Sequence, residues 1–300
     1  LVELYRRRAQ QIRDRYDYLV LFYSGGADST NILQTFINND IKLDEIAQFY
    51  SFEGDQDLNS NFNAEVTKVA IPWSSIVRDR HSWIKHRIID QSQLIEDIYQ
   101  QPEIRDDFIF QQNTCLSPNN FARAYLRSWV QDYRDMIDLG KRVCFIWGSE
   151  KPRLSQVHGR YCIRFQDMID NCVSPLLQQQ LRPGWFDELF YWSPDFAAGI
   201  IKQAHMVRKN LYTMPLLDPY FQSSHSPFGM VHRDGKTHYL TDHGLHSIIY
   251  PGWDINTFSV GKKRSPILSL RDSWYINKSH GTTSRFLHGI KKFFIRFSTT

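Results

Sequence analysis

The chain of 300 residues has little cysteine and no long apolar run, and both shortages narrow its class. Its four cysteines form no CxxC pair, which argues against a disulfide framework and against a structural zinc site. No apolar stretch approaches the roughly 20 residues of a membrane span, and the basic start lacks the apolar core of a signal peptide. We therefore expect a cytoplasmic protein in a reducing compartment, without a membrane partner.

Two common phosphate-binding motifs are missing as well. No lysine follows the glycines as a GxxxxGK[ST] loop requires, and the dinucleotide fingerprint GxGxxG does not occur. The chain instead has an apolar run over residues 18–23, then two glycines, then apolar residues at the spacing of one helical face. This order predicts a buried strand, a tight loop and a helix. The loop and the start of the helix contain Ser24, Gly25, Gly26, Asp28, Ser29 and Thr30.

Such a loop predicts an anion-binding site. Adjacent glycines let the backbone turn sharply and approach a ligand without a Cβ, and the helix behind them offers N–H groups and the positive end of its dipole. Ser24 and Ser29 add hydroxyl donors. Asp28, in contrast, is negatively charged and accepts hydrogen bonds. A carboxylate at an anion-binding site is explained if the anion binds together with a Mg²⁺ ion. Polyphosphate together with Mg²⁺ is therefore the expected ligand.

Residues 24–29 read SGGADS and match the motif SGGxDS at every position. In this motif and its context the chain resembles the PP-loop ATP pyrophosphatases, the adenine nucleotide alpha-hydrolase-like superfamily. Within it, the chain is most similar to the synthetase domain of asparagine synthetase-like proteins. The resemblance implies ATP and Mg²⁺ as cofactors, with Asp28 in catalysis and metal binding. The resemblance becomes weaker beyond residue 155.

The periodicity of the first half predicts an α/β fold with a doubly wound parallel sheet. An amphipathic helix is expected ahead of the first strand, and successive strands are joined by long or helical connections. The helix is expected over 2–15, and the strands over 18–23, 45–50, 65–71 and 142–148.

The pattern also predicts how the chain divides. Residues 74–139 show no strand pattern and are expected to form a mostly helical insertion, whose clearest helix runs over 117–140. We expect an ATP-binding domain over 1–155. Residues 156–300 are expected to form a substrate-specific region of helices and loops that ends in a basic, aromatic tail.

The ends of two further strands add candidate ligand-binding residues, because the carboxyl ends of parallel strands meet at one edge of a sheet. The resemblance implies that Phe49, Tyr50 and Ser51 contact the adenine and ribose. This assignment rests only on their position at the end of the second strand. The alternative is that both aromatic residues belong to the core.

The strand over 142–148 ends in Gly148 and a charged turn, which resembles the glycine-bearing loop of several PP-loop families. We expect Lys151 and Arg153 to neutralise the pyrophosphate and so to act in catalysis. Glu150 is expected to help place Mg²⁺ or a substrate amine. The alternative is a solvated turn with a local ion pair.

The second half leaves more alternatives open. A helix is expected from Ser193 to Asn210, with His205 on its face rather than in catalysis. Five histidines fall within residues 223–246, but their spacing matches no metal-ligand set, so a substrate-facing loop is favoured. Residues 257–300 have nine Lys and Arg against one acid, with aromatics between them. This segment is expected either to bind nucleic acid or to end in an amphipathic helix that packs on the body.

The leading interpretation is an AMP-forming ligase. As the resemblance implies, an oxygen of a small-molecule acceptor attacks the α-phosphorus of ATP, pyrophosphate leaves, and a nitrogen nucleophile displaces AMP to form an amide or C–N bond. We expect no glutaminase ahead of the loop, so the nitrogen comes as free ammonia, from a glutaminase or other amine-donor partner, or within the substrate. The alternatives are an enzyme that modifies tRNA or a nucleobase, and a nucleotide-binding protein with a structural or regulatory role.

Overall fold

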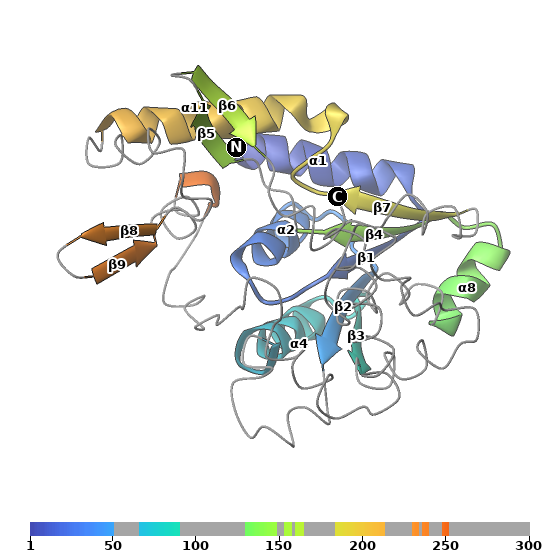
Figure 1. The fold of residues 1–300 in the computed structure, drawn as a ribbon. Coiled ribbons are helices and arrows are strands. Elements are labelled where there is room, and N and C mark those ends of the chain that lie inside the picture. Colours follow the sequence, from blue (N-terminus) through green and yellow to red (C-terminus); the bar gives the residue numbers. More distant parts are fainter. Residues whose placement is uncertain are drawn as a thin grey trace, which may run out of the picture.

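The computed structural model of the chain describes residues 1–50, 66–90, 130–148, 153–157, 160–164, 184–213, 230–233, 236–239 and 248–251. Its centre is a sheet of five parallel strands with helices on both faces, which makes it an α/β fold (Figure 1). The strands of this sheet are β1 (Tyr18–Phe22), β2 (Glu45–Tyr50), β3 (Lys85–Asp90), β4 (Val143–Trp147) and β7 (Trp185–Leu189).

β1 is the central strand of the sheet. The order across the sheet is β3-β2-β1-β4-β7, so Val20 pairs with Glu45 of β2 on one side and with Phe145 of β4 on the other. The chain moves outward from β1 through β2 to β3, and then crosses back to β4 and β7. The direction of winding therefore reverses between β1 and β4, an arrangement compatible with a doubly wound sheet. Ligands of such sheets bind outside the carboxyl ends of the strands at this reversal.

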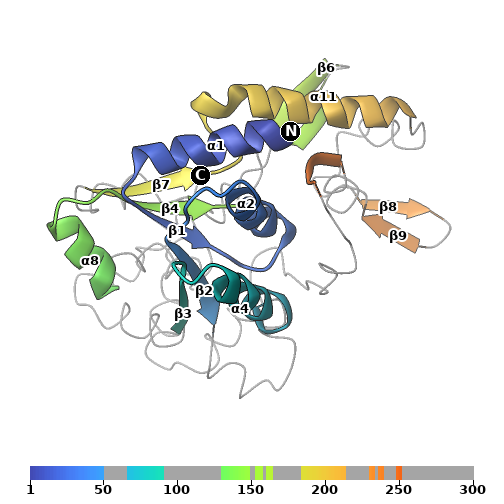
Figure 2. The ribbon, with the colours of Figure 1, turned by 180° about the vertical axis from the view of Figure 1, so that it is seen from behind.

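The helices are α1 (Val2–Arg15), α2 (Ala27–Asn38), the short π-helix η2 (Val66–Ala70), α4 (Ile71–Arg80), α8 (Gln131–Asp138), the 3₁₀ turn η3 (Pro194–Phe196) and α11 (Ala197–Thr213). Two antiparallel pairs form sheets of their own: β5 (Arg153–Val157) with β6 (Arg160–Arg164), and β8 (Met230–Arg233) with β9 (Lys236–Tyr239). Seen from behind, α11 lies along α1, away from β3 (Figure 2). Within the ranges given above, no helix combines the length and the apolar character needed to cross a bilayer.

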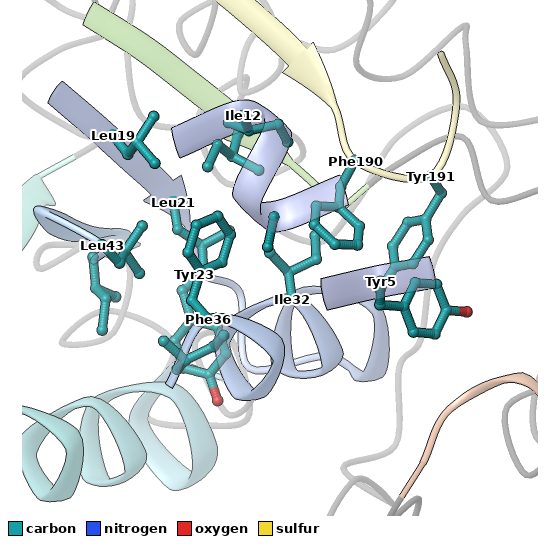
Figure 3. Packing of buried hydrophobic residues seen from close by; sticks show 14 of the residues in the cluster. Tyr5, Ile12, Leu19, Leu21, Tyr23, Ile32, Phe36, Leu43, Phe190 and Tyr191 are labelled. Atoms are coloured by element: carbon teal, nitrogen blue, oxygen red, sulfur yellow. The ribbon is translucent and has the colours of Figure 1, made fainter. Parts of the chain in front are cut away.

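The main hydrophobic core lies between the sheet and the helices α1, α2 and α4. Because side chains alternate along a strand, Leu19 and Leu21 of β1 point to this side. Figure 3 shows them among Tyr5, Ile12, Tyr23, Ile32 and Phe36. Phe22 points to the other face, where its ring stacks on Phe145 with centroids 5.7 Å apart. The Tyr133 ring of α8 meets Phe145 edge-on at 5.1 Å, so α8 covers part of that second face.

Several elements confirm the sequence predictions. The amphipathic helix over 2–15 is α1, and the strands over 45–50 and 142–148 are β2 and β4. α2 ends at Asn38, and Asp40 then takes the left-handed conformation with φ 53°. The helix expected from Ser193 begins there, because the Ser193 hydroxyl accepts a hydrogen bond from the Asp195 N–H and caps η3.

The strand expected over 65–71 is wrong. Residues 66–70 form η2 and lead into α4, which begins at Ile71 and has Pro72 in its first turn, whereas Glu65 lies outside the described residues. The third strand is β3 instead, within the segment 74–139 that was expected to be helical. β3 is an edge strand, and its side chains are exposed or only half-buried, so its sequence contains no sustained apolar run.

Of the helix expected over 117–140, residues 117–129 lie outside the described residues, and the helix does not continue through Val130. Val130 has an extended backbone, with φ −79° and ψ 112°, and stands at the N-cap of α8, so the helix in this region begins at Gln131. Its end is confirmed: Gly140 has φ +81°, and the N–H of Lys141 donates to the carbonyl of Met136 at 3.0 Å.

The sheet continues beyond residue 155 through β7, which the sequence did not indicate. A buried guanidinium joins β7 to α1: Arg8 Nη2 donates to Glu188 Oε2 at 2.6 Å, and Arg8 Nε donates to the carbonyl of Phe190 at 3.3 Å. The division of the chain at residue 155 stays a prediction, although strand β7 of the central sheet lies beyond that residue.

A buried polar group connects β2, β3 and α4. Gln48 Nε2 donates to Ser74 Oγ at 2.6 Å, which leaves the Gln48 Oε1 to accept from His86 Nε2 at 2.9 Å. Burial, and after it the charge of Arg78, lower the pKa of His86 below its ordinary value. The folded protein therefore favours the neutral imidazole.

This lowered pKa predicts a pH effect on stability. The unfolded chain binds the His86 proton more readily, so the free energy of unfolding decreases as the pH falls below about 6.5. We expect urea unfolding to show a smaller decrease between pH 7 and pH 5 in His86→Gln than in the wild type. Equal decreases in the two proteins would show that His86 is not the group responsible.

Candidate functional site

The loop between β1 and α2 forms at the carboxyl edge of the sheet. The N–H of Tyr23 still donates to the carbonyl of Ala47 in β2, at 2.9 Å, and the chain then leaves the sheet. Gly25 has φ +80°, a conformation that favours glycine, and Gly26 is the extended N-cap of α2. The carbonyl of Gly26 accepts the N–H of Thr30 at 3.0 Å, which starts the helix. The strand, loop and helix predicted over residues 18–37 are thus confirmed.

Hydroxyl groups fix the shape of the loop from inside. Ser29 Oγ donates to the carbonyl of Gly26 at 3.2 Å and accepts from the N–H of Ser24 at 3.3 Å. Ser24 is exposed, and its Oγ accepts the N–H of Gly26 at 3.3 Å. Thr30 lies beneath the loop, with its Oγ1 3.2 Å from the hydroxyl of Tyr23. Ser29 and Thr30 are buried, whereas Ser24 is exposed at the surface of the loop while its Oγ lies 3.3 Å from Ser29 Oγ.

The first turn of α2 supplies donors for an anion. N–H groups in the first turn of a helix have no acceptor within the helix, and Gly26 at the N-cap brings no side chain to accept one. The dipole of this 12-residue helix adds partial positive charge at the same end. The loop therefore has the backbone chemistry of an anion cradle.

Gly148 brings the end of β4 against this cradle. A Cβ placed on Gly148 would lie 3.1 Å from the N atom of Ser29 and 3.3 Å from the carbonyl carbon of Asp28. Both neighbours are backbone atoms of the first turn of α2, which cannot swing aside as a side chain can. The structure thus brings together two stretches that the sequence predicted separately, at the point where the winding of the sheet reverses.

This contact predicts that Gly148→Ala is destabilising. The added methyl group pushes β4 away from α2, and overpacking of this kind costs about 1–3 kcal/mol in the free energy of unfolding. Urea unfolding measures the cost, and the amide NMR signals of Asp28 and Ser29 show whether the displacement reaches the loop. Unchanged stability and unchanged signals would contradict the close approach.

The other predicted strand-end residues separate into two groups. Phe49 is buried, and its ring stacks on Phe22 with centroids 5.2 Å apart, which favours the core alternative for Phe49. Tyr50 is half-buried and packs against the main core. Ser51, Glu150 and Lys151 lie outside the described residues, and Arg153 is the first residue of β5.

Asp28 is held by two tyrosines that the sequence did not indicate. The Tyr250 hydroxyl donates to Asp28 Oδ1, and the Tyr191 hydroxyl donates to the Asp28 carbonyl at 2.7 Å. Asn31 Nδ2 in turn donates to the Tyr191 hydroxyl at 2.9 Å. The two tyrosines stand 163 and 222 positions beyond Asp28, in segments without a motif, so no local pattern could have pointed to them.

Burial keeps both phenols protonated. It raises the pKa of Tyr250 and of Tyr191 well above the ordinary value, and the Asp28 carboxylate raises both further. Each hydroxyl therefore remains a hydrogen-bond donor across the pH range in which proteins are stable.

A metal ion at this loop would be bound by Asp28 together with an anionic ligand. Within the part of the chain that the structure describes, no three His, Cys, Asp or Glu side chains gather so that they could hold a metal ion. Mg²⁺ commonly takes one or two carboxylates together with substrate phosphates and water, so a single Asp28 carboxylate beside an anion cradle suits it. The histidines expected in a loop over 223–246 lie outside the described residues, except for His232 in β8 and His238 in β9.

Comparison of the sequence with protein-family models gives no matching family, and comparison with curated proteins gives no matching relative. The interpretation of the site therefore depends on its residues and on their place in the sheet.

Proposed function

We propose that the chain is a PP-loop ATP pyrophosphatase that acts as an AMP-forming ligase. One observation carries the proposal: the SGGxDS loop lies at the carboxyl edge of a parallel sheet where the winding reverses, with Gly148 of the neighbouring strand end packed against it. This is where α/β sheets bind nucleotides. The chemistry of the loop selects an anionic ligand, and the motif indicates ATP.

The residues of the loop would bind and orient the triphosphate. The backbone N–H groups of Gly25 and of the first turn of α2 would donate to phosphate oxygens, and the exposed Ser24 would add its hydroxyl. Asp28 would hold Mg²⁺, whose positive charge would offset the negative charge of the phosphates. Lys151 and Arg153 stay predicted partners of the leaving pyrophosphate.

The proposed reaction proceeds in two displacements. An acceptor oxygen forms a bond to the α-phosphorus of ATP while the bond to the β-phosphate oxygen breaks, which gives an acyl or imidoyl adenylate and pyrophosphate. A nitrogen nucleophile then attacks the activated carbon, AMP leaves, and a proton passes from nitrogen to solvent. The loop contributes by fixing the pyrophosphate end and by stabilising its growing charge.

The basic segment over 257–300 motivates the second candidate function, modification of tRNA or of a nucleobase. Nine Lys and Arg with interleaved aromatics suit phosphate neutralisation and base stacking. Thiolation is the less expected chemistry, because the four cysteines form no CxxC pair. Among the described residues, Cys144 is fully buried in β4, and burial raises the pKa of its thiol. C–N bond formation is then the reaction for either class of acceptor.

Labelled ATP tests the reaction and separates the candidates. ATP carrying label at the α- or the γ-phosphate is incubated with the protein and with either a metabolite extract or total tRNA. We expect AMP and pyrophosphate with one of the two pools, and that pool identifies the acceptor class. ADP and phosphate would refute the proposed cleavage, and ATP binding without any turnover would support the regulatory alternative.

A further inference from the structure

The segment 248–251 reaches the loop from a distant part of the chain. Ile249 and Tyr250 are buried in the main core, and the Tyr250 ring lies 5.6 Å from Tyr191 and 6.5 Å from Tyr5, between ring centroids. Figure 3 shows Tyr5 and Tyr191 side by side at the end of the core that adjoins α2. From this aromatic cluster the Tyr250 hydroxyl reaches the Asp28 carboxylate.

Two helices fix the segment in place. The Tyr5 hydroxyl of α1 donates to the carbonyl of Ile249 at 3.0 Å, and Gln203 Nε2 of α11 donates to the Tyr5 oxygen at 2.6 Å. Tyr5 and Gln203 are almost fully buried, so these bonds are shielded from competition with water. The position of Tyr250 is thus set by α1 and α11 and not by a flexible side chain at the surface.

We propose that Tyr250 is a positioning residue for Asp28: its hydroxyl holds the carboxylate in one orientation at the first turn of α2 and so sets the affinity of the loop for Mg²⁺. The role of Asp28 toward Mg²⁺ rests on the function proposed above. The orientation of Asp28 does not, because it is a property of the protein without any ligand. A carboxylate that is already oriented loses less conformational freedom when it binds a metal.

The test compares two hydroxyl deletions in the same ring cluster. Tyr250→Phe removes the donor to the carboxylate, and Tyr191→Phe removes the donor to the backbone carbonyl of the same residue. ATP binding is measured by calorimetry against Mg²⁺ concentration. We expect the Mg²⁺ concentration at half-maximal binding to rise about tenfold in Tyr250→Phe, the equivalent of one hydrogen bond to a charged group, and to change less than about twofold in Tyr191→Phe.

Three results of this titration would overturn the proposal. An equal rise in both variants would show a merely structural role for the cluster. No rise in Tyr250→Phe would show that the phenol does not orient the carboxylate for metal. A fall would show that the phenol competes with the metal.

A second measurement needs no nucleotide. Three-bond NMR couplings of Asp28 in the ligand-free protein report its χ1 rotamers. We expect a single rotamer in the wild type and in Tyr191→Phe, and averaging over several in Tyr250→Phe. Averaging already in the wild type would refute the proposal even if Tyr250→Phe failed to fold. Absence of Mg²⁺-dependent ATP binding in the wild type, with the rotamers as expected, would refute the proposed function alone.

Discussion

Asp28→Asn is expected to lower the rate of pyrophosphate release from ATP by about 100- to 1,000-fold, while the fold stays intact. The substitution removes the negative charge that would hold Mg²⁺ at the loop. It retains an oxygen that can accept the hydrogen bond from Tyr250, so the buried phenol keeps a partner. Asp28→Ala is the poorer test, because it removes the charge and the acceptor of the Tyr250 hydroxyl together.

The control for this prediction is Asp14→Asn. Asp14 is an exposed residue of α1 that accepts a hydrogen bond from Gln10. Its substitution therefore causes the same change of charge outside the loop. We expect Asp14→Asn to retain full activity and both variants to melt within about 2 °C of the wild type. An Asp28→Asn protein that is folded and fully active would contradict a role for this carboxylate.

Glu45→Ala is expected to reduce the free energy of unfolding by about 3–5 kcal/mol. Glu45 is fully buried at the start of β2, and three donors converge on its carboxylate. Arg87 Nε and the Tyr133 hydroxyl each donate to Oε1 at 2.6 Å, and the Tyr18 hydroxyl donates to Oε2 at 2.9 Å. Glu45→Ala therefore removes the carboxylate that accepts hydrogen bonds from two phenols and one half-buried guanidinium.

The matched control is Asp132→Asn. Asp132 also binds Arg87, at 2.6 Å, but half of its side chain is exposed to solvent. Hydrogen bonds from Lys85 and Arg87 lower its pKa to about 2. Solvent screens this ion pair, so we expect Asp132→Asn to cost less than about 1 kcal/mol in urea unfolding. Similar costs for Glu45→Ala and Asp132→Asn would show that burial does not decide the strength of this cluster.

The central strands could be predicted from the sequence and the edge strands could not. β1 and β4 are buried on both faces, so their residues form apolar runs that stand out from their surroundings. β3 and β7 lie at the two edges, where exposed and half-buried side chains alternate without a clear period. The error over 65–71 has a related cause, because a short apolar segment before a proline suits a strand end and a helix start equally well.

In the candidate site, the loop itself could be predicted from its own residues, whereas its contacts with residues distant in the sequence could not. The loop Ser24–Ser29 carries its conformation in its own residues: glycine at the positive φ of Gly25, hydroxyls that close the turn, and a helix behind. Tyr191 and Tyr250 act on Asp28 only because the fold returns distant segments to α2. For Phe49 the sequence left ligand contact and the core as alternatives, because its place at a strand end suits both, and its packing against Phe22 favours the core.

The most direct test of the account is to map ATP binding onto the backbone amides by NMR. Titration with Mg²⁺ and ATP, and separately with pyrophosphate or AMP, follows the signals of Gly25, Gly26, Ser29 and Gly148. We predict large shifts at these amides with ATP and with pyrophosphate, and small ones with AMP, which lacks the pyrophosphate group. No shift at the loop, or equal shifts with AMP and ATP, would contradict the claim that this loop binds the pyrophosphate end of ATP.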